Sequence, residues 1–222
     1  NVPYTENCYL DPDCANRMLR KHGEADAVVL CNVLAHTEDP KGMIENAARL
    51  LKADGWLVIE APHLACMIAN GDYSSVYHEH GHYFSHRTLH RMTREQFSGR
   101  HIERLQVHGG SLRLWLRKKA TKGIRWRLPA FEEPPVDWAR FAERAHTHRD
   151  ELRAACETDG VLVGVCAPAK ATVLLNWTGI RPSYITDTTE AKQGRFIPGT
   201  EVRIVSPRNL LAEPVGKALM LA

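Results

Sequence analysis

The stretch YHEHGHYFSH, from Tyr77 to His86, is the densest group of reactive side chains in the sequence. Together with His90 it holds five of the twelve histidines. An imidazole with a pKa near ~6.5 accepts a proton at neutral pH, and a neighbouring carboxylate raises its basicity or orients it. A phenol can donate a hydrogen bond to a developing oxyanion. Tyr77, Glu79 and His80 therefore have the chemistry to remove a proton next to a carbonyl group and to stabilise the enolate.

Two other interpretations of these histidines remain open. His78, His80 and His82 alternate, so they share one face of an extended segment and could contribute to a metal site. Metal sites need three or four converging ligands, however, and neither HExxH nor a comparable spacing is present. The plainer interpretation is that several of them are surface residues. We expect this of His86 and His90, which lie four residues apart in a predicted helix.

Two cationic loops indicate a site for an anion. CAPAKA lies where a predicted strand turns into a helix, so backbone N–H groups and the helix dipole favour a phosphate there, and Lys170 adds a charge. The P-loop pattern GxxxxGK[ST] is absent. KQGR follows the next predicted strand, so Lys192 and Arg195 could approach the same crevice. Two such loops fit a diphosphate, although a solvated run of charges is the ordinary alternative.

The elements that position these residues begin with a predicted β–α–β unit. The apolar run Ala25–Cys31 is typical of a buried parallel strand. Asp39 as N-cap and Pro40 in the first turn predict a helix, which Gly55 closes before the strand WLVIEAP. His36 falls between the first strand and this helix, either as a loop residue or at the edge where open α/β sheets bind ligands.

An antiparallel hairpin and a second unit complete the predicted organisation. Ser85 caps a helix that reaches about Phe97, and HIERLQVHGGSLRLWLRKK then predicts two strands around a tight turn. Residues 1–119 form the first domain in this interpretation, and a proline-rich linker follows at 120–136. In residues 137–222 an amphipathic helix precedes alternating strands and helices, which predicts a smaller α/β domain.

Composition describes an ordinary soluble globular protein of 222 residues, with 44% hydrophobic and 25% charged residues. The formal net charge of +3 is too small to indicate a nucleic-acid partner. No apolar run approaches the ~20 residues of a membrane span, and the start has no signal-peptide pattern. Six scattered cysteines without a CxxC pair predict free thiols in a reducing cytoplasm. Because the sequence starts at Asn1 and stops in an apparent strand, we expect a piece of something longer.

Five blocks in this order resemble the sugar C-methyltransferases: NVLAH, YHEHGHYFS, HGGSLR, APAKA…LLN and KQGRFIPGT. These enzymes use S-adenosylmethionine to methylate a carbon of nucleotide-linked 4-keto-deoxysugars. The resemblance runs from about Ala25 to the end of the chain. It implies an α/β protein with a partial class I methyltransferase sheet that ends in an antiparallel hairpin, followed by a second, smaller Rossmann-like domain.

The resemblance also implies roles for individual residues. His80 is the base that takes the α-proton, after which the enolate carbon attacks the methyl group of S-adenosylmethionine. Tyr77 and His36 stabilise the charge on oxygen, and Glu79 orients His80 or a sugar hydroxyl. The two cationic loops hold the nucleotide diphosphate, with dTDP as the expected nucleotide. The substrate contacts expected there are Lys170, Asn176, Lys192 and Arg195. The implied partner is a nucleotide sugar, with no nucleic acid and no membrane.

The chain departs from the family pattern in several places. The glycine-rich loop for S-adenosylmethionine, the acidic residue for its ribose and the cysteines of a zinc domain would all precede Asn1. Structural zinc is therefore expected only outside this chain. The cofactor contacts expected within it are Asn32, Val33 and Leu34, with the turn ENCY beside them. Cys166 and Ala171 stand where relatives have glycine, so the CAPAKA loop should be less open. The alternatives are a catalytically impaired nucleotide-sugar-binding remnant and a metal enzyme that uses the histidine cluster.

Overall fold

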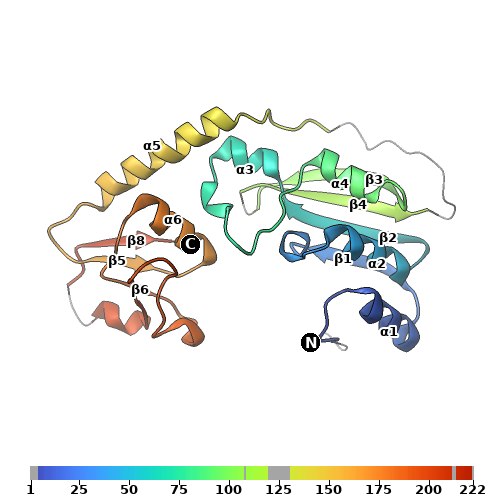
Figure 1. Cartoon of the computed structure of the whole chain (residues 1–222), viewed down its shortest axis with the longest axis horizontal. Helices are drawn as coiled ribbons and strands as arrows, with labels where there is room; N and C mark the ends of the chain where they lie inside the picture. The colour runs from blue at the N-terminus through green and yellow to red at the C-terminus, as the bar shows by residue number, and fades with distance from the viewer. Residues whose placement is uncertain (1–4, 108, 120–130, 212–213, 222) are drawn as a thin grey trace. The chain divides into compact units, whose positions relative to one another are not determined.

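The computed structural model describes residues 5–107, 109–119, 131–211 and 214–221, and its contacts divide the chain into two compact units (Figure 1). The first unit comprises Asn1–Met67 and Glu79–Val136, and the second comprises Ile68–His78 and Asp137–Ala222. The first unit ends at Val136, and the second unit resumes at Asp137. Ile68–His78 groups with the second unit instead of the first. Of the expected linker, residues 120–130 lie outside the described residues.

The first unit contains a mixed four-stranded sheet with the order β1-β2-β4-β3 (Figure 1). Strand β1 (Ala25–Cys31) is parallel to β2 (Leu51–Pro62), and helix α2 (Pro40–Leu50) connects them. Strand β4 (Ser111–Lys118) is antiparallel to both β2 and β3 (Phe97–Leu105). The predicted β–α–β unit and hairpin are therefore confirmed, and with them the predicted fold class.

The core of this unit follows from the two-residue period of its strands. Alternate residues of β2 and β4 face helix α2 and helix α4 (His86–Thr93), and they are fully buried. They are joined in one apolar cluster by residues from both helices and from the start of β3. The central members are Leu57, Ile59, Leu112, Leu114, Leu116, Ile44, Leu89 and Phe97.

Helix α2 begins where the sequence predicts but ends earlier. The Asp39 carboxylate accepts a hydrogen bond from the Gly42 N–H at 2.8 Å, which satisfies a free donor of the first turn. The helix ends at Leu50, so the prediction that Gly55 closes it was wrong. Leu51 is fully buried as the first residue of β2, and the left-handed Asp54 (φ 58°) lies where the pairing of β2 with β1 shifts register, between Leu51 and Trp56.

Strand β1 is less buried than its apolar sequence predicted. Only Leu30 is buried, whereas Val29 is 62% exposed. Among the described residues, β2 is the single neighbour of β1, so β1 lies at a sheet edge. Its alternate residues point away from the face that packs against α2, which explains the difference.

The start of the chain corrects the cysteine prediction. Helix α1 (Pro12–His22) is capped by Asp11, whose carboxylate accepts from the Cys14 N–H at 2.7 Å. This turn brings Cys8 near the first helical turn, and Cys8 and Cys14 form a disulfide with their Cα atoms 6.4 Å apart. The prediction of free thiols was wrong for this pair. The other four cysteines are free.

The second unit is a smaller parallel sheet with the order β7-β6-β5-β8 (Figure 1). Its strands are β5 (Leu162–Val165), β6 (Tyr184–Thr186), β7 (Ile204–Val205) and β8 (Lys217–Met220). Helix α5 (Trp138–Cys156) precedes β5, and α6 (Ala169–Thr178) links β5 to β6. All three strand pairs are parallel, which confirms the predicted Rossmann-like arrangement. The remaining short elements are α3 (Leu64–Asn70), η1 (Leu34–His36), η2 (Tyr73–Ser75), η3 (Glu190–Lys192) and η4 (Pro207–Leu211).

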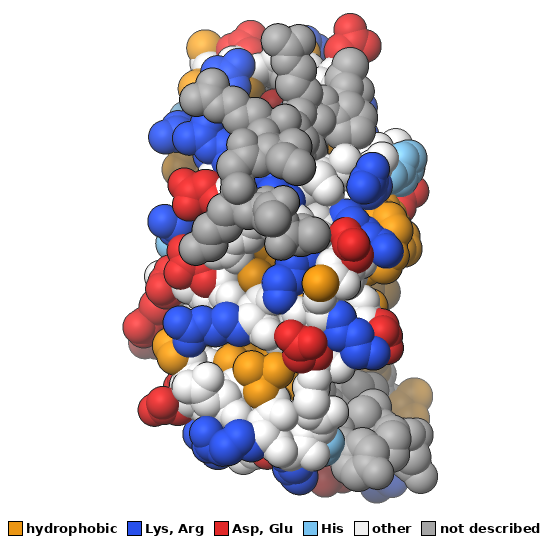
Figure 2. All heavy atoms as spheres, turned by 90° about the vertical axis from the view of Figure 1, so that its right-hand side faces the viewer, with side chains coloured by type: hydrophobic (Ala, Val, Ile, Leu, Met, Phe, Trp, Pro, Cys, Tyr) orange, Lys and Arg blue, Asp and Glu red, His pale blue; other side chains and the backbone are white. Residues whose placement is uncertain are grey.

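The face drawn in Figure 2 carries charged side chains of both signs. Lysine and arginine side chains alternate there with aspartate and glutamate among the described side chains. No helix in the described part of the chain is long and apolar enough to cross a membrane.

Candidate active site

The first unit brings His36 and His80 together at the end of β1. His36 ends η1, which follows that strand, and its ring centroid lies 4.9 Å from that of His80. The Gly81 N–H donates to the Ala35 carbonyl at 2.9 Å, so a backbone bond fixes the histidine segment to η1. The carboxyl ends of strands are the edge at which open α/β sheets bind ligands. Two residues 44 apart in sequence thus form one imidazole pair at a ligand-binding edge.

The surroundings of His80 suit proton transfer. Its ring is half-buried and meets the Tyr83 ring edge-on at 6.3 Å. Glu79 and His36 are exposed, so the pair is accessible from solvent. An imidazole that is partly desolvated yet reachable can exchange a proton with a bound substrate.

The unit boundary falls within YHEH. Tyr77 and His78 belong to the second unit, and Glu79 and His80 belong to the first. Tyr77 is half-buried and His78 is exposed. The His82 ring stacks on Phe84 with centroids 6.3 Å apart. Among the described residues, no three His, Cys, Asp or Glu side chains are grouped as a metal site requires, so the metal interpretation gains no support.

His86 and His90 are more buried than the prediction of surface positions implies. Both are half-buried, and the His86 ring packs 5.2 Å from the Phe131 ring. Burial lowers the pKa of each imidazole. The Nε2 atom of His86 is buried without a hydrogen-bond partner in the described part of the chain. Ser85 caps α4 as predicted, with its Oγ accepting from the Thr88 N–H at 3.1 Å, but the helix ends at Thr93.

A second cluster around His63 was not anticipated. His63 is fully buried, with Nδ1 3.0 Å from Cys66 Sγ and Nε2 2.9 Å from Glu133 Oε1. The same Glu133 oxygen accepts from the His86 backbone N–H at 2.7 Å. Burial lowers the pKa of His63 despite Glu133, and burial raises the pKa of the Cys66 thiol. The neutral imidazole therefore donates to Glu133 and accepts from the thiol. The available signal was the position of His63 directly after a buried strand.

These buried histidines predict how the first unit responds to acid. His63, His86 and His90 have pKa values below the ordinary 6.5 because burial disfavours the charged ring. The unfolded chain then binds more protons than the folded chain between the lowered values and 6.5, so stability falls as the pH falls through that window. We expect the free energy of unfolding, measured by urea titration, to decrease from pH 7 to pH 5, and His63→Gln to flatten this slope. An unchanged slope in that variant would assign the acid sensitivity to other groups.

The expected cofactor contacts lie at the end of β1. Asn32 adopts a left-handed conformation (φ 52°), its Nδ2 donates to Glu60 Oε1 at 3.3 Å, and its Oδ1 is buried without a partner among the described residues. The buried Glu60 also forms an ion pair with Arg113, whose Nη2 lies 2.7 Å from Glu60 Oε2. Val33 is exposed, whereas Leu34 is a core residue and can offer only its backbone.

A cavity of about 510 Å³ adjoins this edge. This volume lies within the usual range for small-molecule sites, ~300–1,000 Å³. The cavity is lined by residues that include Tyr9, Leu10, His36, Asp39, Asn46 and Arg49. The Asn46 side-chain amide donates to the Leu10 carbonyl at 3.0 Å, and this bond holds the segment that includes the turn ENCY along α2.

The two cationic loops of the second unit meet at one sheet edge. The Lys192 ammonium donates to the Ala167 carbonyl in CAPAKA at 2.9 Å and to Asp187 at 3.1 Å. Asp187 follows β6 and also accepts from the Ala167 N–H at 2.8 Å. Although burial opposes it, hydrogen bonds from Thr189, Ala167 and Lys192 hold the pKa of Asp187 far below its usual range. Lys170 forms an ion pair with Asp72 at 3.0 Å.

The other residues expected in or beside these loops differ in their hydrogen-bond partners and in their burial. Arg195 is exposed, and its guanidinium has no hydrogen-bond or ion-pair partner in the described part of the chain. Asn176 donates from Nδ2 to the carbonyls of Thr172 and Pro198 at 2.8 and 2.9 Å, so it ties the loop after KQGR to α6. Cys166 occupies a left-handed position (φ 68°), which glycine adopts more readily. Ala171 is fully buried.

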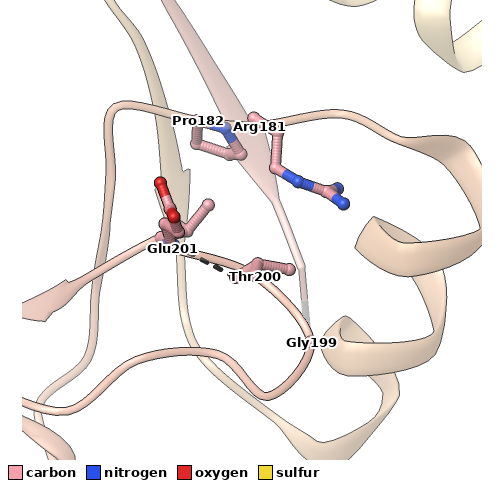
Figure 3. Close-up of a pocket in the computed structure, with 6 residues that line it drawn as sticks. Arg181, Pro182, Gly199, Thr200 and Glu201 are labelled. Carbon is pink, nitrogen blue, oxygen red and sulfur yellow. Dashed lines mark hydrogen bonds between the residues drawn. The ribbon is translucent and has the colours of Figure 1, made fainter.

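A separate hollow of about 560 Å³ lies at the opposite, amino edge of the second sheet (Figure 3). It is lined by residues that precede β6 and β7: Arg181, Pro182, Gly199, Thr200, Glu201 and Val202. The Arg181 guanidinium donates to the carbonyls of Leu175 and Ile180 at the end of α6. Its charge is therefore used within the fold, and we place the candidate anion site at the other edge.

Comparison with known proteins gives two family matches that together span most of the chain. Residues 106–222 match the C-methyltransferase C-terminal domain, and residues 5–96 match a methyltransferase domain. The C-methyltransferase NovU of Streptomyces niveus is 28% identical over 226 residues, covering 91% of this chain and 52% of that protein. The chain thus spans about half the length of this relative.

Similarity to solved structures is slight. The N-methyltransferase NodS from Bradyrhizobium japonicum WM9, in complex with S-adenosyl-l-homocysteine, is 20% identical with a TM-score of 0.33, over 42% of this chain and 45% of that one. An O-methyltransferase family protein from Burkholderia thailandensis is 19% identical with a TM-score of 0.37, over 53% and 36%. The C-terminal-domain match alone covers more than half of the sequence, and the chain belongs to the C-methyltransferase family.

Proposed function

We propose that this chain is part of an S-adenosylmethionine-dependent C-methyltransferase that acts on a nucleotide-linked keto-deoxysugar, with dTDP as the nucleotide. The observation that carries the proposal is the His36–His80 pair, with ring centroids 4.9 Å apart at the end of β1, in a member of this family. An accessible imidazole pair at a ligand-binding sheet edge suits deprotonation next to a ketone. The similarity to a C-methyltransferase over 91% of the chain supports carbon as the acceptor atom.

The proposed mechanism begins with His80. Its imidazole takes the proton from the carbon next to the ketone, and the C–H electron pair becomes the enolate. Tyr77 and His36 donate hydrogen bonds to the enolate oxygen, which lowers the energy of the developing charge. Glu79 orients His80 or a sugar hydroxyl. S-adenosylmethionine, held by Asn32, Val33 and Leu34, would supply an electrophilic methyl group to the enolate carbon.

The end of β1 fits part of that cofactor. The buried Asn32 Oδ1 lacks a partner among the described residues and can accept a hydrogen bond, while Val33 offers an exposed apolar surface. Leu34 contributes through its backbone, because its side chain is in the core. We assign these three residues to cofactor binding.

The diphosphate is assigned to the cationic loops of the second unit. A lysine ammonium has three N–H donors, and Lys170 uses one of them on Asp72. Lys192 uses two of its N–H donors, on the Ala167 carbonyl and on Asp187, and the exposed Arg195 guanidinium can offer all of its donors to a phosphate. Asn176 lies six residues beyond Lys170, roughly 9 Å along α6, so its contribution is through the loop that it holds.

Solvent exchange tests the deprotonation step without a methyl donor. The chain is mixed with a dTDP-linked 4-keto-deoxysugar in D₂O, and the α-proton signal is followed by NMR. We expect protein-dependent loss of that signal, because the enolate is reprotonated from solvent. Binding without exchange would favour a nucleotide-sugar-binding remnant, and neither binding nor exchange would refute the proposal.

A lysine variant tests the anion site. We expect Lys170→Ala to weaken binding of the dTDP-sugar by ~1–3 kcal/mol, because a charge-assisted contact to phosphate is lost. Isothermal titration measures this effect. Lys41→Ala serves as the control, because Lys41 is exposed on α2 and forms an ion pair with Glu45 of its own helix. Unchanged affinity in Lys170→Ala would move the phosphate site elsewhere.

A further inference from the structure

The segment Ile68–His78 is held by side chains of the second unit, although it leads directly into Glu79 and His80. From α5, the Arg144 guanidinium donates to the Ala69 carbonyl, and His148 Nδ1 lies 2.9 Å from the Tyr73 hydroxyl. From α6, the Trp177 ring lies 6.3 Å from the Tyr73 ring. Two helices of the second unit thus contact this short stretch.

The Asp72 carboxylate joins this segment to α6 and to the two serines that follow it. Its Oδ2 accepts from the Lys170 ammonium at 3.0 Å and from the Ser75 hydroxyl at 2.6 Å, and its Oδ1 accepts from the Ser74 hydroxyl at 2.9 Å. The side chain is only 17% exposed. Because Asp72 directly precedes η2, these bonds fix both the start of the short helix and its attachment to α6.

Lys170 connects this attachment to the proposed anion site. It lies in the first turn of α6, at the end of the CAPAKA loop, and its side chain is 40% exposed. Only one of its three ammonium donors is used by Asp72, so two remain for an anion. One charged group can therefore contact both a bound phosphate and the carboxylate that anchors the segment. Tyr77 follows Asp72 by five residues within the same unit.

We propose that Asp72 is a positioning residue for the reaction: through Lys170 it fixes the segment that carries Tyr77 and continues into Glu79 and His80. The second unit then does more than hold the nucleotide, because its α6 helix also fixes the stretch within the same unit that ends in Tyr77 and His78. This inference rests on the proposed function for its catalytic consequence, while the anchoring itself can be measured without substrate.

The test uses Asp72→Asn and a matched control. Asparagine keeps the shape of the side chain but removes the charge that pairs with Lys170. Asp26→Asn makes the same change in the exposed Lys52–Asp26 ion pair at the start of β1. Two quantities are compared: hydrogen–deuterium exchange of the amides in 69–80, followed by mass spectrometry without substrate, and the kcat and KM of α-proton exchange.

In Asp72→Asn we expect amide exchange in 69–80 to quicken about tenfold while the β5 and β6 amides stay protected, because only local opening becomes easier. We expect kcat to fall about tenfold or more, since small misplacement of reacting groups is costly, with KM within about twofold because Lys170 is intact. Asp26→Asn should change neither quantity.

Each other result overturns a specific part of the inference. Unchanged amide protection and unchanged kcat would show that Asp72 has no positioning role. A raised KM with unchanged kcat would make it a binding residue instead, and loss of protection throughout the second unit would make it a residue of the fold. If the wild-type chain neither binds the nucleotide sugar nor exchanges its α-proton, the proposed function fails, and the amide measurement alone decides whether Asp72 anchors the segment.

Discussion

In a His80→Asn variant, we expect α-proton exchange of the keto-sugar to fall to the background rate, while affinity for the nucleotide sugar stays within a few fold. Asparagine approximates the size and polarity of the imidazole but has no nitrogen that is basic at neutral pH. General-base catalysis typically contributes ~10²–10⁴-fold to a rate, so its loss should dominate the kinetics. The nucleotide contacts assigned to the second unit are unaffected, which separates binding from chemistry. The measurement is the NMR exchange assay together with a binding titration.

The same segment provides a matched control. His82 is also half-buried, but its ring stacks on Phe84 and does not pair with His36. We expect His82→Asn to retain most of the exchange activity. Near-normal turnover in His80→Asn would refute the assignment of the base. In a parent protein with a complete cofactor site, the same variant should also abolish methyl transfer.

The second large effect concerns the stability of the first unit. Phe97 begins β3 and is fully buried among the leucines of β4 and residues of α2 and α4. Phe97→Ala removes most of the ring and leaves a cavity, so we expect it to reduce the free energy of unfolding by about 3–5 kcal/mol. Urea denaturation of wild type and variant, with amide exchange of β2 and β4 as a unit-specific probe, measures this difference.

The control for this variant is Phe196→Ala, which removes the same atoms from a side chain that is 56% exposed. We expect a change within about 0.5 kcal/mol, as for most surface substitutions. If Phe97→Ala cost less than about 1 kcal/mol, the ring would not be packed as the structure describes, because even modest core truncations usually exceed that value. Comparing the two variants separates loss of apolar atoms in general from loss of buried ones.

The sequence by itself determined the local elements, because their signals lie within a few residues of each other. The bounds of β1 follow from one apolar run, and the start of α2 follows from Asp39 and Pro40. The β3–β4 hairpin follows from two alternating stretches around a glycine-rich turn. The ordered motifs also indicated the family, which the match over residues 106–222 supports. Helix ends were less well predicted: α2 stops at Leu50 and α4 at Thr93, and Leu51 and Phe97 are instead buried as the first residues of β2 and β3.

Only the tertiary structure decided which of the reactive residues meet. The resemblance implied that His36 and His80 both act on the sugar, but neither the contact between their rings nor the partners of Lys170 and Lys192 were expected. Lys170 pairs with Asp72, 98 residues away, and Glu133 bonds His63, 70 residues away. Spacing in the sequence carries no signal for such contacts, because they depend on how separate elements pack.

The tertiary structure also decided which side chains are buried. His86 and His90 have the i, i+4 spacing of an exposed helix face, yet both are half-buried, and this burial lowers the pKa of both; the His86 ring packs against Phe131. Ile68–His78 lies between elements of the first unit in sequence but is bound by α5 and α6. Residue type set what each side chain can do, and the packing of distant segments set its charge, its partners and its access to a substrate.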